Sequence, residues 1–314
     1  MIRVDNLVKN YGDVKAVRDI SFQVNDGEIL GFLGENGAGK STTLKVITGY
    51  LSPTEGNVIV DDLNILDNSL EIRRRVGYLP ELNPLYGEMM VYDLLEFTAQ
   101  IRDIQGAEFR RALDRVVDQC GLSGVIHREI RACSKGYKQR IGLATAMLHD
   151  PDILILDEPT VGLDPNQIVE IRELVKGLGK EKTLIISSHI LQEIEATVDR
   201  IIIIHSGEIV ADGTSGELLS SLRGNTQLTL EVKQAGDESV QQLSTRFEGV
   251  PLLTDVAENG NRVLTLEYDR TIDPREDVFH FAKESGWVIL EMSQARVQLE
   301  EVFRNLTLEG AVHA

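Results

Sequence analysis

The sequence predicts an α/β fold built on a parallel sheet, and three observations support this prediction. A short apolar run at 29–33 leads into a glycine loop and then into residues at helical spacing. Two further apolar runs, at 153–156 and 184–186, are followed by polar side chains, as expected where strands of such a sheet end beside a ligand. The complete prediction adds an antiparallel β subdomain, an inserted helical subdomain and a small α+β C-terminal domain.

The length and the charge distribution indicate two domains. A chain of 314 residues exceeds one typical core. Residues 1–223 carry 24 basic and 34 acidic side chains, whereas 224–314 carry 8 and 16, so the acidity is denser after Gly224. We therefore place a domain boundary there. The formal charge of −18 argues against a protein held to nucleic acid by bulk electrostatics, and no nucleic-acid partner is expected.

The sequence has no membrane span or targeting segment that we recognise. No run of about 18 apolar residues occurs. The first residues lack the basic and apolar regions of a signal peptide, so a cytoplasmic location is expected. The two cysteines, Cys120 and Cys133, have no metal-ligand spacing and are predicted to be reduced and structural.

The N-terminal segment predicts an antiparallel pair of strands. Residues 2–9 and 16–24 alternate apolar and polar side chains on either side of a turn at Tyr11-Gly12-Asp13. An exposed aromatic such as Tyr11 would suit stacking on a nucleotide base, and the alternative is a residue that only packs the hairpin. Residues 57–60 form a further short strand after the turn at 52–56.

The glycine loop is the strongest motif. It has the P-loop (Walker A) pattern in the required context of strand, loop and helix, and its residues are Gly34, Glu35, Asn36, Gly37, Ala38, Gly39, Lys40 and Ser41, with Thr42 continuing the helix. The glycines let backbone N–H groups surround a polyphosphate at a helix N-terminus. Lys40 would reach the β- and γ-phosphates of ATP, and the Ser41 hydroxyl would bind Mg²⁺. The alternative is a glycine-rich turn without a ligand.

The middle of the chain changes from strand to helix. Residues 76–79 read as a strand that ends at Pro80, with the carboxylate of Glu81 just beyond it. The preceding run Arg73-Arg74-Arg75 is interpreted as a solvated helix face. From about 91 to 149 the apolar residues recur at helical spacing without a strand, which predicts the inserted helical subdomain. Its last helix should begin after Ser134, a good N-cap.

Two carboxylates end the next strand. Asp157 and Glu158 follow four apolar residues and are hard to explain as core residues, but they suit a magnesium site. Asp157 would bind Mg²⁺, and Glu158 would act as a general base on the water that attacks the γ-phosphate. A solvated acidic turn is the alternative. The strand at 183–188 ends at His189, which would meet the γ-phosphate rather than serve only in packing.

These motifs and their order resemble the nucleotide-binding subunit of ABC transporters over about residues 1–220. The resemblance implies that Tyr11 stacks on adenine and that His189 is the switch histidine. The D-loop is matched by 161–164, which ends at Asp164. The family signature, usually Leu-Ser-Gly-Gly-Gln, is matched at 133–137 only by Ser134 and Gly136, the two positions expected to touch the γ-phosphate of a partner subunit.

The departures from the family pattern are informative. Glu81 stands where the family has the Q-loop glutamine, which the resemblance assigns to metal coordination and coupling to the membrane subunit. The Leu-Pro-Glu and Ser-Lys-Gly-Tyr variants and the run at 160–167 are similar to the ABC-2 exporter branch, above all the gliding-motility-associated (Gld-type) ATPases. Residues 299–307 are similar to the close of the accessory domain in that branch. On residues alone, 224–314 predicts a small α+β domain without a catalytic motif, and its lone Trp287 is expected in the core. The predicted strands are 227–232, 252–256, 262–268 and 288–292, and the predicted helices are 238–247, 276–284 and 299–306.

The resulting hypothesis is an ATPase that powers a separate ABC-2-type transmembrane permease. Its cofactors would be ATP and Mg²⁺, its location the inner face of the membrane, and its ATP-bound form a head-to-tail homodimer. The competing hypothesis is a non-transport ABC ATPase of the translation or DNA-repair type, which usually has two cassettes or a long coiled coil, whereas this sequence has one Walker A motif. A regulatory module without turnover conflicts with the presence of Glu158.

Overall fold

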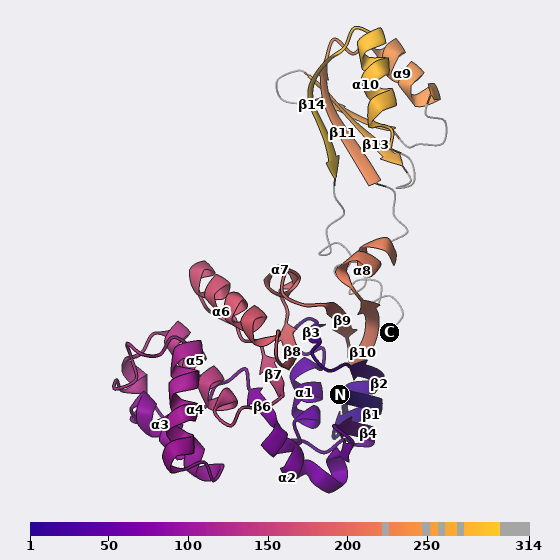
Figure 1. Cartoon of the computed structure of the whole chain (residues 1–314). Helices are drawn as coiled ribbons and strands as arrows, with labels where there is room; N and C mark the ends of the chain where they lie inside the picture. The colour runs from indigo at the N-terminus through magenta and orange to yellow at the C-terminus, as the bar shows by residue number, and fades with distance from the viewer. Residues whose placement is uncertain (222–225, 247–251, 257–260, 269–272, 296–314) are drawn as a thin grey trace. The chain divides into compact units, whose positions relative to one another are not determined.

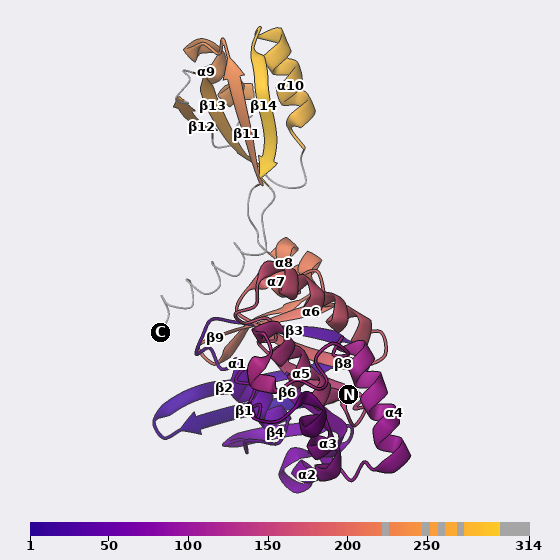
Figure 2. The same cartoon turned by 90° about the vertical axis from the view of Figure 1, so that its left-hand side faces the viewer.

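The computed structural model describes residues 1–221, 226–246, 252–256, 261–268 and 273–295. They belong to two compact units, Met1–Leu218 and the described part of Leu219–Val302 (Figures 1 and 2). The unit boundary lies a few residues before the domain boundary predicted from charge. Within the described residues, no helix combines the length and the apolar character needed to cross a membrane.

An antiparallel sheet of four strands, in the order β2-β1-β4-β5, forms one side of the first unit. Its strands are β1 (Ile2–Tyr11), β2 (Val14–Val24), β4 (Glu55–Val60) and β5 (Leu63–Asn64). The predicted hairpin is confirmed, with Ile2 opposite Val24 in the register. Alternate residues such as Ile2, Val4 and Val58 are buried because the sheet has one face against the core, which produces the period-two pattern in the sequence.

The second sheet is mainly parallel and has six strands in the order β10-β9-β3-β8-β7-β6. They are β3 (Ile29–Leu33), β6 (Val76–Leu79), β7 (Ile153–Asp157), β8 (Thr183–Ser188), β9 (Arg200–His205) and β10 (Glu208–Gly213). β3, β7 and β8 are buried along their whole length. Parallel strands end at the same edge, so the residues after β3, β7 and β8 are brought together there.

Helices surround this sheet and form the insert (Figure 1). They are α1 (Lys40–Ile47), α2 (Ile65–Arg75), α3 (Val91–Ile101), α4 (Gly106–Gln119), the short 3₁₀ turn η1 (Ile130–Ala132), α5 (Lys135–Met147), α6 (Pro165–Leu178), α7 (Leu191–Ile194) and α8 (Ser215–Ser221). The predicted N-cap is confirmed: the Ser134 hydroxyl accepts a hydrogen bond from the Tyr137 N–H at 3.3 Å. Both cysteines are free and buried, as predicted.

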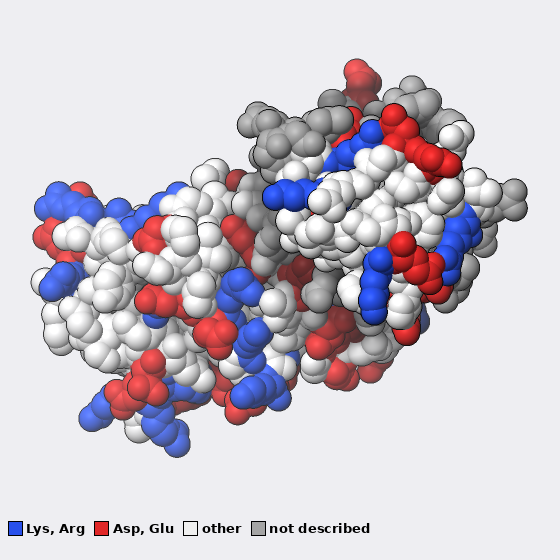
Figure 3. Space-filling model, turned by 90° about the horizontal axis from the view of Figure 1, so that it is seen from above, with Lys and Arg blue, Asp and Glu red and all other residues white. Residues whose placement is uncertain are grey.

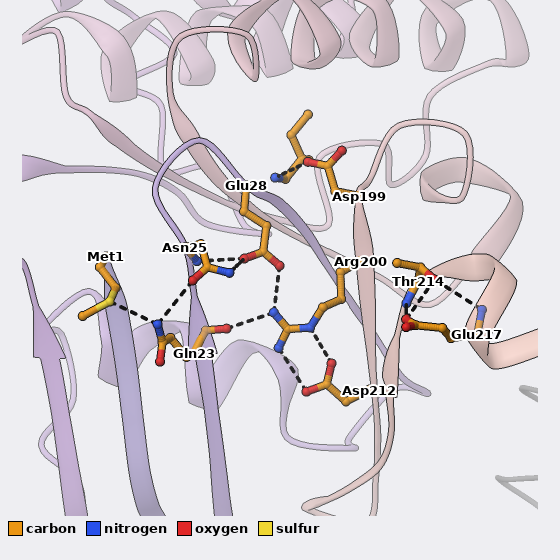
Figure 4. A network of polar contacts seen from close by, with 10 residues as sticks. Met1, Gln23, Asn25, Glu28, Asp199, Arg200, Asp212, Thr214 and Glu217 are labelled. Carbon is orange, nitrogen blue, oxygen red and sulfur yellow. Dashed lines mark hydrogen bonds and ion pairs between the residues drawn. The ribbon is translucent and has the colours of Figure 1, made fainter. Parts of the chain in front are cut away.

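Arg200 connects the two sheets of the first unit (Figure 4). Its guanidinium donates to the Gln23 carbonyl at 3.0 Å, at the end of β2, and to Glu28 at 2.7 Å, just before β3. It also binds both carboxylate oxygens of Asp212 on β10, at 2.5 and 3.0 Å. These partners raise the pKa of Arg200, with the Asp212 hydrogen bond as the largest cause. The two hydrogen bonds to Asp212 hold the Arg200 guanidinium in one orientation and also pair its charge.

The described residues of the second unit form a four-stranded antiparallel sheet with two helices. Its elements are β11 (Thr226–Lys233), α9 (Asp237–Arg246), β12 (Leu252–Val256), β13 (Arg262–Tyr268), α10 (Arg275–Glu284) and β14 (Val288–Ala295). The strand order β12-β13-β11-β14 with the chain order βαββαβ is ferredoxin-like. Trp287 is buried and belongs to the core, as predicted. The last predicted helix, 299–306, lies outside the described residues.

Candidate functional site

The Walker A loop requires glycine at two positions where other chain segments approach closely. A Cβ at Gly34 would lie 2.5 Å from the Ile204 carbonyl oxygen, and a Cβ at Gly39 would lie 2.5 Å from that of Ala16. Gly39 also has a φ of 109° and is the residue before α1. A side chain at either position would displace the backbone that forms the loop. The loop therefore presents the N-terminus of α1 toward the cavity beside it.

A cavity of 230 Å³ opens beside this loop. It is lined by Ala16, Asn36, Gly37, Gly39, Lys40, Ser41, Thr42, Glu81 and Glu158. The structure thus brings residues of the Walker A loop together with Glu81 and Glu158, two carboxylates that the sequence placed just after other strands. Gly34, Glu35 and Ala38 belong to the loop itself; the first two present their carbonyl oxygens to Lys40, and Ala38 is buried.

Lys40 and Glu158 form a buried ion pair inside this cavity. The Lys40 Nζ lies 3.1 Å from Glu158 Oε1, and the two side chains are only 5% and 4% exposed. The same ammonium donates to the carbonyls of Gly34 at 2.6 Å and Glu35 at 3.2 Å. A buried ammonium needs such partners, because desolvation without them costs several kcal/mol. The pair sets the charge at the point where a phosphate would bind.

His189 contacts the other oxygen of the same carboxylate. Its Nδ1 lies 2.8 Å from Glu158 Oε2. Glu158 has a φ of 51°, in the left-handed region that is uncommon for residues other than glycine. The strained backbone turns this side chain toward Lys40 and His189 at once. Lys40 and His189 therefore both contact the carboxylate of Glu158, so the three predicted catalytic residues lie together.

Asp157 is held by two hydroxyl groups from neighbouring elements. Its Oδ1 accepts from Ser187 at 2.6 Å and from Ser41 at 3.1 Å. Its Oδ2 is buried and makes no hydrogen bond of normal geometry in the described part of the chain, although the Tyr78 phenol lies nearby. An unpartnered buried carboxylate oxygen beside a serine hydroxyl fits a hard divalent cation. The residues present thus fit Mg²⁺, with Ser41 and Asp157 as ligands.

Glu81 lines the same cavity and could supply a further oxygen to a metal ion. Among the residues that the structure describes, no group of three or more His, Cys, Asp or Glu side chains could hold a metal by itself. A magnesium ion here would thus need phosphate oxygens and water to complete its coordination, as is usual for Mg²⁺ beside a nucleotide.

Two residues near Asp157 were missed by the sequence reasoning. The Ser187 hydroxyl accepts a hydrogen bond from the Glu158 N–H at 2.9 Å and donates to Asp157, so Ser187 holds the Asp157 carboxylate and the Glu158 backbone. The only sequence signal was its place on β8, which the sheet pairs with Asp157 in parallel register. The other residue is Tyr78 on β6. Burial, followed by the charge of Asp157, raises the pKa of the Tyr78 phenol, which therefore stays neutral.

Replacing Ser187 with alanine should lower both the stability of the protein and the extra stability that Mg-ATP confers. We expect Ser187→Ala to lower the free energy of unfolding by about 1–3 kcal/mol, because Asp157 Oδ1 and the Glu158 N–H each lose a buried partner. It should also reduce the extra stability conferred by Mg-ATP, measured as the shift of the urea midpoint. Ser188→Ala is the control, because the Ser188 hydroxyl bonds only the local backbone at Ile190. An equal loss of Mg-ATP stabilisation in both variants would contradict this role.

The signature residues and the D-loop lie elsewhere in the unit. Ser134, Gly136 and Asp164 line a separate cavity of 460 Å³ between the N-termini of α5 and α6. Asp164 caps α6 by accepting from the N–H groups of Asn166 and Gln167, each at 3.1 Å. None of these residues lines the Walker A cavity of the same chain. The predicted ATP ligands are thus divided between two places on one subunit.

Tyr11 is placed at the end of β1 and is 48% exposed. Lys9 Nζ lies 5.4 Å from the centre of its ring. Tyr11 does not line the cavity, although Ala16 of the following strand does. Its exposed face remains accessible to a base, so adenine stacking stays a prediction.

The fold and the site define a P-loop ATPase with an inserted helical subdomain. A family model described as "ABC transporter" matches residues 17–161. The bacitracin transport ATP-binding protein BcrA of Bacillus licheniformis is 41% identical over 214 residues, which cover 68% of this chain and 69% of that protein. BcrA of Enterococcus faecalis is 31% identical over 314 residues, 99% of this chain and 98% of that one. The chain therefore belongs to the ABC transporter family, as an ATP-hydrolysing subunit.

The solved structures agree with this assignment. A dimeric, post-hydrolysis structure of the ATP-binding cassette MJ0796 bound to ADP and Pi superposes with a TM-score of 0.63 at 25% identity. It covers 68% of this chain and 98% of that cassette. The likeness thus concerns the cassette and leaves about a third of this chain outside it, while the full-length relative extends across the second unit as well.

Proposed function

We propose that two copies of this chain close head to tail around ATP and drive an exporter through a separate ABC-2-type permease. The observation that carries the proposal is the division of the predicted ATP ligands. Lys40 and Glu158 line one cavity, whereas Ser134 and Gly136 line another on the same subunit. In a head-to-tail pair, the second set of one copy faces the first set of the other, and the N-terminus of α5 meets the γ-phosphate.

Within each site, the residues exchange partners when ATP binds. The phosphates take over the Lys40 ammonium from the two loop carbonyls and from Glu158. Glu158 is then free to accept a proton from the attacking water, and His189 keeps the carboxylate oriented through its contact at 2.8 Å. Bound Mg²⁺, held by Ser41 and Asp157 with Glu81 nearby, would neutralise phosphate charge. Loss of the γ-phosphate removes the link between the copies and lets them separate.

Export is favoured by the relatives, two of which are named as bacitracin transport subunits. For the permease contact, we propose a group of exposed apolar side chains that follows Glu81 and continues onto α3: Leu82, Tyr86, Met90 and Phe97. Tyr86 and Phe97 lie edge to face at 6.1 Å. Exposed apolar residues gathered in this way mark protein interfaces. The chain would then lie on the inner face of the membrane, bound through its permease.

One finer point remains a prediction, and the alternative function is less favoured. The similarity to Gld-type ATPases, and with it a role in gliding motility, rests on sequence resemblance. The translation or DNA-repair alternative is less favoured, because a transport subunit matches across nearly the whole chain. Lys and Arg side chains are interspersed with Asp and Glu on the face shown in Figure 3, which gives a nucleic acid no extended basic surface there.

Mixing two damaged subunits tests the head-to-tail arrangement. Lys40→Ala damages the Walker A cavity, and Ser134→Arg places bulk at the α5 N-terminus and removes its N-cap hydroxyl. Each variant alone should occlude little labelled ATP. In a mixed head-to-tail dimer, one site carries both lesions and the other carries none, so we expect occlusion to reappear, at up to about half of the parental sites per mixed dimer.

The readout is nucleotide occlusion, because one intact site need not sustain full turnover. Circular dichroism and cross-linking first establish that both variants are folded and that they associate. If the mixture then occludes no more ATP than either variant alone, the two ligand sets act within one subunit and the head-to-tail arrangement is wrong.

A further inference from the structure

A cavity of 610 Å³ lies in the first unit between α2, the α3–α4 connection and the end of α5. Its volume is within the range of about 300–1,000 Å³ typical of small-molecule sites. It shares no lining residue with the Walker A cavity or with the signature cavity. The ATPase mechanism makes no use of it, so its chemistry has to be explained separately.

Three arginines line this cavity, Arg73 and Arg74 from α2 and Arg102 from the end of α3. Arg73 donates to the Ser69 carbonyl at 3.2 Å, and Arg102 donates to the Arg73 carbonyl at 3.4 Å. Within the described residues, none of the three forms an ion pair with a carboxylate. The neighbouring Arg75, which does not line the cavity, pairs with Glu71 at 3.2 Å.

Arg102 has no carboxylate within ion-pair distance in the described part of the chain, although Asp103 and Glu108 line the same cavity. Burial lowers the pKa of its guanidinium, and only Tyr50 acts in the opposite direction. Arg102 is partly buried, so a ligand that supplies a negative charge would stabilise its guanidinium. The run of arginines expected to be a solvated helix face is thus exposed on α2 but also contributes two guanidiniums to this cavity.

His149 lines the same cavity at the end of α5. Both ring nitrogens are buried without a hydrogen bond of normal geometry, although the ring lies near the Val76 backbone. Burial, with the charge of Arg102 as the next cause, lowers its pKa to about 3. His149 is therefore neutral near pH 7 and adds no charge to the cavity.

The remaining wall carries two other kinds of group. Asp103 and Glu108 supply carboxylates, which would repel a second acid but accept hydrogen bonds from hydroxyl groups. Leu70 and Ile101 are apolar and are 60% and 67% exposed. Guanidiniums, carboxylates and apolar side chains together select a molecule with an anionic end, hydroxyl groups and an apolar face.

We infer that this cavity binds a phosphate ester carrying hydroxyl groups, either as a free molecule or as a lipid headgroup. Arg73, Arg74 and Arg102 hold the phosphate, because the guanidinium fork matches the oxygens of a phosphate group and donates charge-assisted hydrogen bonds to them. Asp103 and Glu108 bind the hydroxyl groups. Such a ligand joins α2 to the α3–α4 insert and so restrains the helical subdomain against the sheet core.

Calorimetric titration of the full chain tests this inference. The protein is first saturated with a non-hydrolysable ATP analogue and Mg²⁺, so that the Walker A cavity is occupied, and analogue binding is recorded separately. The probes are glycerol 3-phosphate and vesicles of phosphatidylglycerol, with phosphatidylcholine vesicles as the blank. The variants are Arg74→Ala and Arg102→Ala, and the matched control is Arg75→Ala on the same helix.

We expect each cavity variant to weaken binding about tenfold and the control to leave it unchanged, since one charge-assisted hydrogen bond is lost. Binding of glycerol 3-phosphate identifies a free ligand, and binding of the anionic vesicles alone identifies a headgroup. The inference is overturned if neither probe binds at millimolar concentration, or if Arg75→Ala weakens binding as much as Arg74→Ala. Arg74 is exposed, so its variant should keep the fold even if Arg102→Ala does not.

Discussion

Glu158→Gln should leave ATP binding intact and reduce ATP turnover about 10²- to 10⁴-fold, the usual contribution of a positioned general base. Glutamine keeps the shape of the side chain, and its amide oxygen can still face Lys40 at the position of Oε1. It cannot accept the proton of the attacking water. The ATP-bound dimer should therefore accumulate instead of separating.

Phosphate release and size-exclusion chromatography with ATP measure the two halves of this prediction. Glu181→Gln is a suitable control, because it makes the same charge change at an exposed position between α6 and β8. A Glu158→Gln protein that hydrolyses ATP at the rate of the control would remove Glu158 from the mechanism, whatever its effect on dimer formation.

Lys40→Ala should weaken binding of Mg-ATP by roughly 10- to 150-fold, the equivalent of about 1.5–3 kcal/mol for hydrogen bonds to charged groups. The phosphates lose the cation that lies at the N-terminus of α1. A second effect follows from the buried ion pair, since the variant leaves the Glu158 carboxylate, 4% exposed, without its ammonium. Breaking a buried pair costs about 3–5 kcal/mol of stability, so the free protein should unfold at lower urea concentration.

Equilibrium binding of a labelled ATP analogue and urea unfolding measure these effects. Lys45→Ala is the control, because Lys45 is on the same helix and exposed. Unchanged affinity and unchanged stability together would show that Lys40 does not serve the phosphate site. Retained stability with lost affinity would mean that His189 alone satisfies the Glu158 carboxylate.

The second unit shows how much of a fold can be predicted from the alternation of apolar and polar residues along a sequence. The strands and helices predicted from 227 to 292 agree with the elements from β11 to β14. In β11 and β13 the reason is plain, because their buried residues repeat with a period of two: Leu228, Leu230 and Val232, and Leu264, Leu266 and Tyr268. Their order in the sheet was not predicted. It depends on which strands pair side by side, and β11 lies between β13 and β14 although both are distant in the chain.

The sequence alone determined the local parts of the nucleotide site. The glycines shape the loop, and Lys40 and Ser41 begin the helix that follows it. Both features depend on residues that are neighbours in the chain. Asp157 and Glu158 were recognisable because two carboxylates after a buried strand need a partner. The N-cap Ser134 was predicted for the same reason: capping is a local interaction of a hydroxyl with the first turn.

Only the tertiary structure decided which of these groups meet. Ser187 reaches Asp157 because β7 and β8 are adjacent in parallel register, a pairing across 30 residues of chain. The Lys40–Glu158 pair and the arginine cavity with His149 likewise join segments far apart in sequence. Such contacts depend on strand order and on the packing of helices against the sheet, and neither periodicity nor residue type specifies these in a single sequence.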